Sequence, residues 1–166
     1  MIAFLAQTLL PFMVVMAGAH DFLTLRIPNW LNGVIALAFF PMALMTGMPA
    51  LMMLWHVLAA AIILAISFGL FSAGFIGGGD AKMLAAAGLW FGWPAVITFL
   101  VLTAIAGGVL AIAVKLWGLV EIEREVRGSA WVKRWLGFKA DLPYGIAIAA
   151  GAILALPGSW WMHLAT

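Results

Sequence analysis

The sequence predicts an all-α polytopic membrane protein, and three observations support that fold class. Of the 166 residues, 67% are hydrophobic and only 8% are charged, which is more apolar surface than a chain of this length can bury in a soluble core. The apolar runs are too long and too continuous for barrel strands, which alternate. Because backbone polar groups in lipid must be paired within the protein, helices remain as the spanning element. We expect one membrane-embedded domain over residues 1–166.

Hydropathy divides the chain into six apolar segments, with Gly and Pro between them. Their approximate limits are 2–20, 30–45, 51–75, 81–93, 94–116 and 143–164. We therefore expect a bundle of six transmembrane helices. The fourth segment falls short of the ~20 residues that a full span needs, so it is expected to be tilted or partial. The first segment lacks an N-terminal Lys or Arg and a clear cleavage site, which argues against a removable signal peptide.

The distribution of basic residues predicts the orientation of the bundle. All eight Lys and Arg residues follow or close the first, third or fifth segment. The connections after the second and fourth segments, and the C-terminal tail, contain none. The positive-inside rule therefore makes that shared side cytoplasmic and puts both termini outside. The six carboxylates fall on the cytoplasmic side by the same alternation. The high isoelectric point comes from a few loop residues and does not indicate a nucleic-acid partner.

The only extended polar stretch is the connector at about 117–140. Trp131, Trp135 and Phe138 recur there at helical spacing, with Lys133 and Arg134 between them. This pattern predicts an amphipathic helix in the cytoplasmic interface, with its aromatic face among the lipid headgroups. A membrane-anchored connector is the simpler interpretation, and a surface that docks substrate is the alternative.

Two carboxylates stand apart from the connector. Asp21 ends the first segment and Asp80 precedes the fourth, each where an apolar helix meets the cytoplasmic interface. Each has a structural interpretation, because Asp21 can be a solvated charge at a helix end and Asp80 can be the N-cap of the fourth segment. Together they indicate catalysis. Two facing carboxylates share one proton, so that one deprotonates a water while the other polarises a carbonyl group.

Other catalytic constellations are not evident in the sequence. There are no cysteines, which excludes thiol nucleophiles, disulfides and thiolate zinc sites. The three histidines are His20, His56 and His163, and the predicted topology puts His20 on the opposite face from the other two. An isolated His of this kind is more often a satisfied or interfacial residue, and a role for His20 in tuning the pKa of Asp21 is a weaker hypothesis. We expect no metal and no cofactor.

Three short motifs resemble one family. Gly77-Gly78-Gly79-Asp80 matches the GxGD signature of the membrane aspartyl peptidases, and the stretch GGGDAK is similar to the form found in type IV prepilin peptidases. The stretch AHDFLTLRIPN resembles the first-aspartate motif of those enzymes, with Pro28 and Asn29 in its Ile-Pro-Asn part. LPYGIAIAAG is similar to the motif that opens their last helix, through Pro143, Tyr144 and Gly145.

The resemblance implies a peptidase that removes short basic leaders from prepilins at the cytoplasmic face of the bacterial inner membrane. The substrate would carry a hydrophobic N-terminal helix. Asp21 and Asp80 are then the catalytic pair, and Gly77 and Gly79 are the motif glycines, whose freedom to adopt positive φ would let a substrate backbone approach. The resemblance also implies a difference, because the larger bifunctional prepilin peptidases carry a cytoplasmic insertion between the first two segments, commonly with paired CxxC zinc ligands. Here the connection from 21 to 29 is short and the chain has no Cys, so N-methyltransferase activity is not expected. The compact form resembles the dedicated peptidase of tight-adherence (Flp) pili, with archaeal preflagellin peptidase as a near relative.

The roles of two basic residues remain open, and so do two other classes of function. Arg26 and Lys82 can simply anchor their helices at the headgroups, or they can contact an acid of the substrate or lower the pKa of a neighbouring aspartate. Carboxylates beside a glycine-interrupted helix also occur in ion and proton transporters. A non-catalytic membrane subunit of a pilus or secretion assembly is the third class of function.

Overall fold

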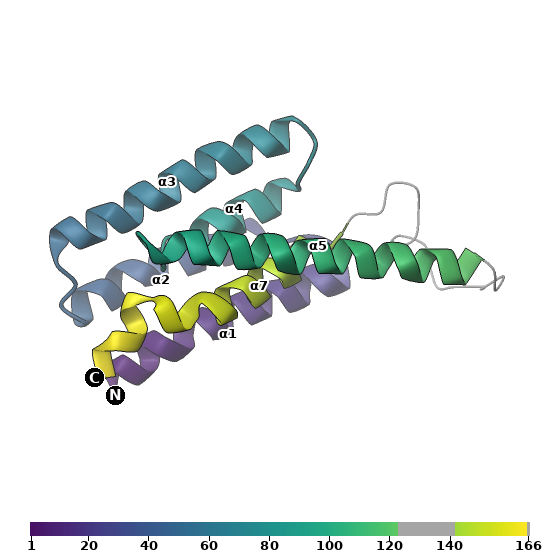
Figure 1. The fold of residues 1–166 in the computed structure, drawn as a ribbon. Helices are drawn as coiled ribbons and strands as arrows, with labels where there is room; N and C mark the ends of the chain where they lie inside the picture. Colours follow the sequence, from purple (N-terminus) through teal and green to yellow (C-terminus); the bar gives the residue numbers. More distant parts are fainter. Residues whose placement is uncertain (123–141, 166) are drawn as a thin grey trace.

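A computed structural model describes residues 1–122 and 142–165, and every regular element in these residues is helical (Figure 1). The described part contains six α-helices followed by two short 3₁₀ helices. In chain order they are α1 (Ile2–Thr24), α2 (Asn29–Met45), α3 (Ala50–Ser72), α4 (Gly78–Gly88), α5 (Ala95–Ile122), α7 (Tyr144–Ala155), η1 (Leu156–Gly158) and η2 (Trp160–Ala165). The prediction of an all-α fold is confirmed.

The six α-helices follow the six predicted apolar segments, with two informative differences. α1 continues one turn past the predicted end, so that Asp21 lies inside the helix and not after it. The last segment breaks after Ala155 into η1 and η2. Pro157 explains this break, because proline lacks a backbone N–H and its ring clashes with the carbonyl group four residues earlier.

Three of the helices are long and apolar enough to cross a membrane. These are α1, α3 and the stretch Ala95–Trp117 of α5. The apolar stretches Asn29–Met45 and Tyr144–Gly158 are shorter, and α4 has only 11 residues. At 1.5 Å per residue α4 is roughly 16 Å long, about half of the hydrocarbon core. The expectation of a short fourth helix is therefore confirmed, whereas six full spans remain a prediction. The predicted amphipathic helix lies outside the described residues, except that α5 extends to Ile122.

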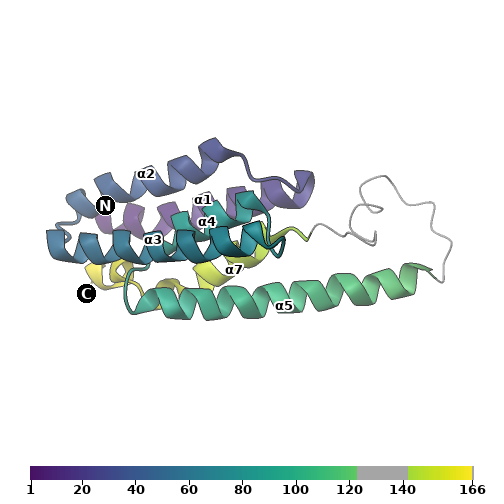
Figure 2. The ribbon, with the colours of Figure 1, turned by 90° about the horizontal axis from the view of Figure 1, so that it is seen from above.

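The helices pack around α4 and α7. α7 packs against α1 and α5, whereas α4 packs against α2, α3 and α7. Seen from above, α3 and α5 run along the bundle with α7 between them (Figure 2). Both termini lie at the same end of the bundle (Figure 1). The end of α1 and the start of α4 lie at the opposite end, which carries the candidate site.

A buried aromatic cluster fixes the end of α4 that lies far from this site. The indole N–H of Trp90 donates to the carbonyl of Ile35 at 2.9 Å, and that of Trp161 donates to the carbonyl of Trp90 at 2.6 Å. The Phe39 ring packs edge-on against both indoles. α4 is therefore held at its C-terminus by α2 and η2, while its first turn presents Asp80 at the other end.

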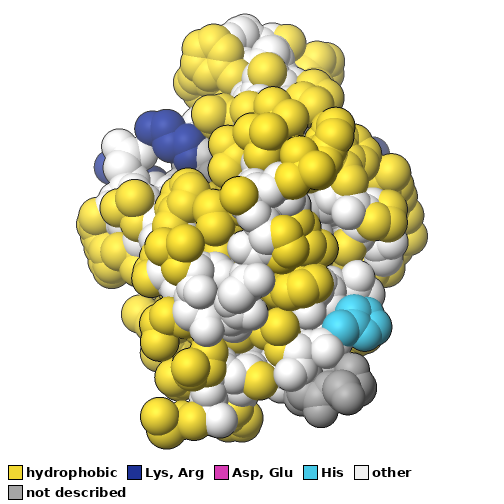
Figure 3. Space-filling view, turned by 90° about the vertical axis from the view of Figure 1, so that its left-hand side faces the viewer, with side chains coloured by type: hydrophobic (Ala, Val, Ile, Leu, Met, Phe, Trp, Pro, Cys, Tyr) yellow, Lys and Arg dark blue, Asp and Glu magenta, His cyan; other side chains and the backbone are white. Residues whose placement is uncertain are grey.

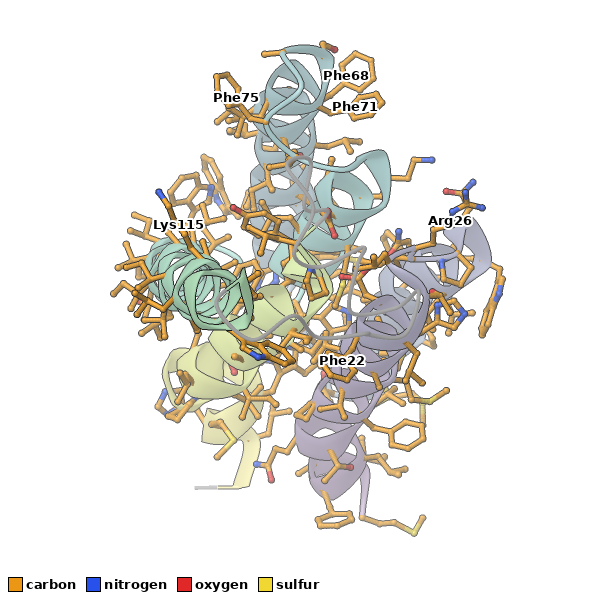
Figure 4. All side chains as sticks on the ribbon, turned by 90° about the vertical axis from the view of Figure 1, so that its right-hand side faces the viewer. Phe22, Arg26, Phe68, Phe71, Phe75 and Lys115 are labelled. Carbon is orange, nitrogen blue, oxygen red and sulfur yellow. The ribbon has the colours of Figure 1, made fainter. Side chains whose placement is uncertain are left out.

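The two ends of the molecule differ in polarity. The face that carries the termini is mainly apolar and shows no acidic side chain among the described residues (Figure 3). The opposite end carries Arg26, between α1 and α2, and Lys115, on α5 (Figure 4). Lys82, in the first half of α4, belongs to the same end of the bundle. The basic residues that the structure describes therefore gather at one end, as the segment alternation predicts.

Candidate active site

Asp21 is held at the junction of α1 and α7. Its side chain is only 4% exposed, and its Oδ2 oxygen accepts a hydrogen bond of 2.8 Å from the backbone N–H of Gly145. Gly145 is the second residue of α7, so its N–H is one of the donors that a helix start leaves without a partner. A carboxylate is favoured at this position, both by that donor and by the helix dipole.

Glycine is required at 145 for this contact. A Cβ on Gly145 would lie 2.8 Å from the Cβ and 2.9 Å from the Oδ2 of Asp21. Gly18 acts in the same way one turn earlier, because a Cβ there would lie 3.0 Å from the carbonyl oxygen of Gly145. α1 and α7 thus approach at two glycines, which is the usual way for membrane helices to come close. The close approach lets the α7 backbone reach a buried carboxylate.

The chain reverses direction one turn after Asp21. Leu25 adopts the left-handed conformation, with φ of 54°, and its N–H bonds to the carbonyl of Asp21. His20 Nδ1 lies 2.8 Å from the carbonyl oxygen of Arg26, and the hydroxyl of Thr24 donates to the same carbonyl at 3.0 Å. His20 therefore bonds to the backbone of the turn that leads into α2, which is a structural role.

Asp80 occupies the first turn of α4. The N-cap of α4 is Gly77, so Asp80 is the third helical residue, and the interpretation of Asp80 as the N-cap is wrong. Its carboxylate accepts a hydrogen bond from the backbone N–H of Gly77. An acid at the third position that reaches back to the N-cap N–H is half of a capping box. The helix start thus holds the carboxylate in place.

The glycines before Asp80 provide space and not an unusual backbone conformation. Gly77 has φ of −70°, and Gly79 is not among the residues with positive φ, so the expectation of positive φ at these positions is wrong. A Cβ on Gly77 would lie 2.7 Å from Oδ2 of Asp80, and a Cβ on Gly79 would lie 3.2 to 3.4 Å from Ile27. The left-handed glycine of this loop is Gly74, with φ of 78° just after α3.

Both carboxylates line one cavity of about 360 Å³, which we call the carboxylate cavity. Burial raises the pKa of Asp80 to about 7, the Asp21 carboxylate acts in the same direction, and the hydrogen bond from Gly77 opposes both. The other walls come from the α1–α2 turn, the loop before α4 and the start of α7. The lining residues are Asp21, Leu25, Gly74, Phe75, Ile76, Gly77, Asp80, Leu142 and Tyr144.

The remaining predicted residues divide into two groups. Gly79, Pro143 and Gly145 do not line the cavity but adjoin residues that do. Gly145 contacts Asp21, Gly79 precedes Asp80, and Pro143 is the buried N-cap of α7 before Tyr144. Lys82 and Asn29 lie elsewhere and contact each other, with Lys82 Nζ donating to Asn29 Oδ1 at 2.8 Å. The other two do not line the cavity: Pro28 is the N-cap of α2, and Arg26 has an exposed side chain.

Asn32 is a residue that sequence reasoning missed. It is 5% exposed, and its Nδ2 donates to the carbonyl of Gly79 at 3.1 Å. This bond ties α2 to the first turn of α4 directly beside Asp80. The available signal was an amide inside an otherwise apolar helix, because buried polar groups in membrane helices are seldom accidental. Within the described residues, no three His, Asp or Glu side chains come together as metal ligands would.

Comparison with known proteins adds one finding. A family model described as the type IV leader peptidase family matches residues 8–112. The chain belongs to this family. The matched region of this family member contains both cavity carboxylates and the glycine loop, and it ends before Pro143, Tyr144 and Gly145. No curated protein and no solved structure matched the chain. Membership makes the chain a peptidase, and with its apolar helices it indicates a membrane protein.

Proposed function

We propose that the chain is a membrane aspartyl endopeptidase that removes the short basic leader of prepilins at the cytoplasmic face. One observation carries the proposal: Asp21 and Asp80 come from helices far apart in sequence and line the same cavity. That cavity lies at the end of the bundle where the described basic residues gather. Family membership supports a leader peptidase, and the paired carboxylates supply a mechanism.

The proposed mechanism assigns different tasks to the two carboxylates. Asp21, which accepts the N–H of Gly145, is the ionised member and takes a proton from water. The water oxygen then bonds to the carbonyl carbon of the scissile peptide. Asp80, whose pKa lies near 7, carries the proton that is donated to the carbonyl oxygen. When the C–N bond breaks, Asp21 gives its proton to the leaving nitrogen and Asp80 takes one back from a hydroxyl of the tetrahedral intermediate, so the pair again holds one shared proton.

The narrower assignment is a peptidase of the Flp type that acts on its prepilin without methylating the product. The turn between α1 and α2 is short, from Leu25 to Pro28, and the chain has no cysteine that could hold zinc there. The charge distribution supports an orientation with both termini outside, and the family resemblance supports the bacterial inner membrane as the location. The two other candidate functions, transport and assembly, do not require the two carboxylates to share a cavity.

The test is cleavage of a model prepilin by the purified protein in detergent or lipid. The model substrate has a short basic leader followed by an apolar helix, and mass spectrometry maps the N-terminus of the product. We expect Asp21→Asn and Asp80→Asn each to lower kcat/KM by roughly 10²- to 10⁴-fold, while insertion and elution stay normal. Normal processing by both variants would instead favour transport or assembly.

A chelator arm of the same assay tests the mechanism. Because the proposed chemistry uses only carboxylates and water, cleavage should survive EDTA, and it should also survive serine- and cysteine-directed reagents. Complete inhibition by EDTA that a defined metal reverses would contradict the carboxylate mechanism even if leader removal itself is confirmed.

A further inference from the structure

A second cavity, of about 490 Å³, lies between α2, α3 and α4 and does not include the carboxylates. Six of its thirteen lining residues are Gly or Ala, with Gly33 and Ala36 from α2, Ala61 from α3 and Ala85 from α4 among them. We call it the small-residue groove. A Cβ added at Gly33 would meet nothing within 4 Å, so the groove is open at that point.

The arrangement of three helices shapes this groove. α2 and α3 each pack on α4 but only sparsely on each other within the described residues. Viewed end-on, α3 stands apart from α1 and α2, with α4 between them (Figure 4). The short α4 is therefore the floor, and the longer α2 and α3 are the walls. Small residues along such walls allow another helix backbone to approach closely, which a flexible acyl chain does not require.

Charge distinguishes one end of the groove. Lys82 and Asn29 line it there, joined by the hydrogen bond of 2.8 Å. No carboxylate among the described side chains pairs with Lys82. Asn32 lines the groove nearby, and its buried Oδ1 oxygen has no hydrogen-bond partner. By contrast, the apolar cavity of similar size between α1 and α7 has no charged residue in its lining. The small-residue groove thus combines an apolar surface with a cation that has no carboxylate partner among the described side chains.

The groove and the carboxylate cavity meet at the first turn of α4. Asp80 lines the cavity and Lys82 lines the groove, and two residues of a helix turn about 200°, so the two side chains leave α4 on different sides. A chain that passes from the groove to the cavity must cross the start of α4 at its glycines. About three extended residues, at ~3.3 Å each, cover the ~10 Å width of a helix.

We propose that the small-residue groove holds the apolar helix of the substrate that follows the scissile bond, and that an acidic side chain near the start of that helix pairs with Lys82. This inference rests on the proposed function, since it takes leader cleavage as given. It adds a binding site for the mature part of the substrate, and it predicts that the sequence after the cleavage point determines affinity. Lys82 is then a substrate-binding residue and not a helix anchor.

Filling the groove tests the proposal. With the model prepilin as substrate, Gly33→Leu should raise KM about tenfold or more and leave kcat within about twofold. Gly108→Leu is the matched control, because Gly108 is also a helical glycine with nothing within 4 Å of an added Cβ and lies on α5. Ala61→Leu fills the groove from the opposite wall and should act like Gly33→Leu, which guards against a folding defect in either variant.

Charge exchange tests the contact with Lys82. On a model prepilin with one Glu in the first turn of its apolar helix, Lys82→Glu should raise KM about tenfold, and Lys82→Arg should retain nearly normal KM. Replacing that Glu of the substrate by Lys should restore the affinity of Lys82→Glu and weaken binding to the wild type. A lysine that only anchors α4 would give no such rescue.

The outcomes separate this inference from the proposed function. If the wild type cleaves the model prepilin while Gly33→Leu and Ala61→Leu behave like Gly108→Leu, the groove does not bind substrate and the inference is wrong, although the peptidase remains. If the wild type does not cleave, the proposed function fails and the inference with it. If filling the groove changes the mass of the solubilised particle, a second copy of the chain occupies it, which also overturns the inference.

Discussion

Asp80 experiences opposing influences at the scale of single residues. The N–H of Gly77 and the start of α4 favour its ionised form, whereas burial and the neighbouring Asp21 favour its protonated form and raise its pKa to about 7. The second pair of influences is stronger. In a two-carboxylate mechanism this leaves one proton on the pair near neutral pH, which is the state that cleavage needs.

The raised pKa of Asp80 predicts a pH dependence of stability with a definite sign. Between about pH 4 and pH 7 the carboxyl of the unfolded chain is ionised while that of the folded chain stays protonated. The unfolded state therefore binds fewer protons, and the free energy of unfolding should fall as pH rises through this window and level off above about pH 7. Asp80→Asn should reduce this slope and stabilise the protein at pH 8 by on the order of 1 kcal/mol.

Denaturant unfolding in detergent, measured from pH 5 to pH 8 on both proteins, checks this sign. On the wild type, kcat/KM should also decline above about pH 7, because the pair then loses its shared proton. A stability curve for Asp80→Asn that keeps the slope of the wild type would show that another group causes it.

At the scale of elements, the position of the first turn of α4 depends on its close contact with the start of α2. Gly79 faces Ile27, and its carbonyl accepts the amide of Asn32. The other end of α4 is fixed by the aromatic cluster around Trp90. Because one end is rigid, a small displacement at Gly79 is transmitted mainly to the adjacent Asp80.

We predict that Gly79→Ala lowers kcat/KM about tenfold while the protein remains folded and inserted. The added Cβ would lie 3.3 Å from the carbonyl oxygen of Ile27, so the first turn of α4 must shift by a few tenths of an ångström and carry Asp80 away from Asp21. Gly69→Ala on α3 is the control, since an added Cβ there meets nothing and should stabilise the helix by roughly 0.4–1 kcal/mol.

Measuring activity and stability on the same preparation separates two explanations of Gly79→Ala. If the variant only loses stability while each folded molecule cleaves at the normal rate, the glycine is needed for packing and not for the geometry of the site. Gly74 differs from Gly79, because its backbone conformation and not its packing requires a glycine. Its positive φ of 78° makes Gly74→Ala costly by about 1 kcal/mol, whatever its effect on cleavage.

At the scale of the whole molecule, the placement of the candidate site at one end of the bundle predicts sidedness. The chain contains no cysteine, so single cysteines can be introduced into an otherwise unreactive protein. Gly158 lies at the end of the bundle that carries the termini, and Ser72 is the last residue of α3 at the opposite end. Gly158→Cys and Ser72→Cys therefore place one thiol at each end. Both positions are exposed.

We expect an impermeant maleimide to label Gly158→Cys in intact cells, and to label Ser72→Cys only after the membrane is opened. The reason is that the basic residues share the end of Ser72 and are retained on the cytoplasmic side. The reverse labelling pattern would put the carboxylate cavity outside and would contradict leader removal at the cytoplasmic face.

Much of this protein follows from its sequence alone. The apolar runs determine six helices, since in lipid each run must satisfy its own backbone, and the glycine loop with its aspartate marks one half of the site. Asp21 could be proposed as the other half because it is a carboxylate at the end of an apolar helix. These features are local, so residues near one another in sequence carry the information.

The tertiary structure determined the features that depend on contacts between distant parts of the chain. The hydrogen bond from Gly145 to Asp21 joins residues 124 positions apart, and that from Asn32 to Gly79 joins residues 47 apart, so neither has a local signature. The glycines before Asp80 were predicted for a flexible backbone, yet Gly77 is needed because the Asp80 carboxylate occupies the space of a Cβ. Gly145, predicted only as a motif residue, is needed for the same reason beside Asp21. Only the packed structure shows which side chain each glycine faces. A glycine is required where another atom occupies the space that a Cβ would fill, and that atom is known only from the packing.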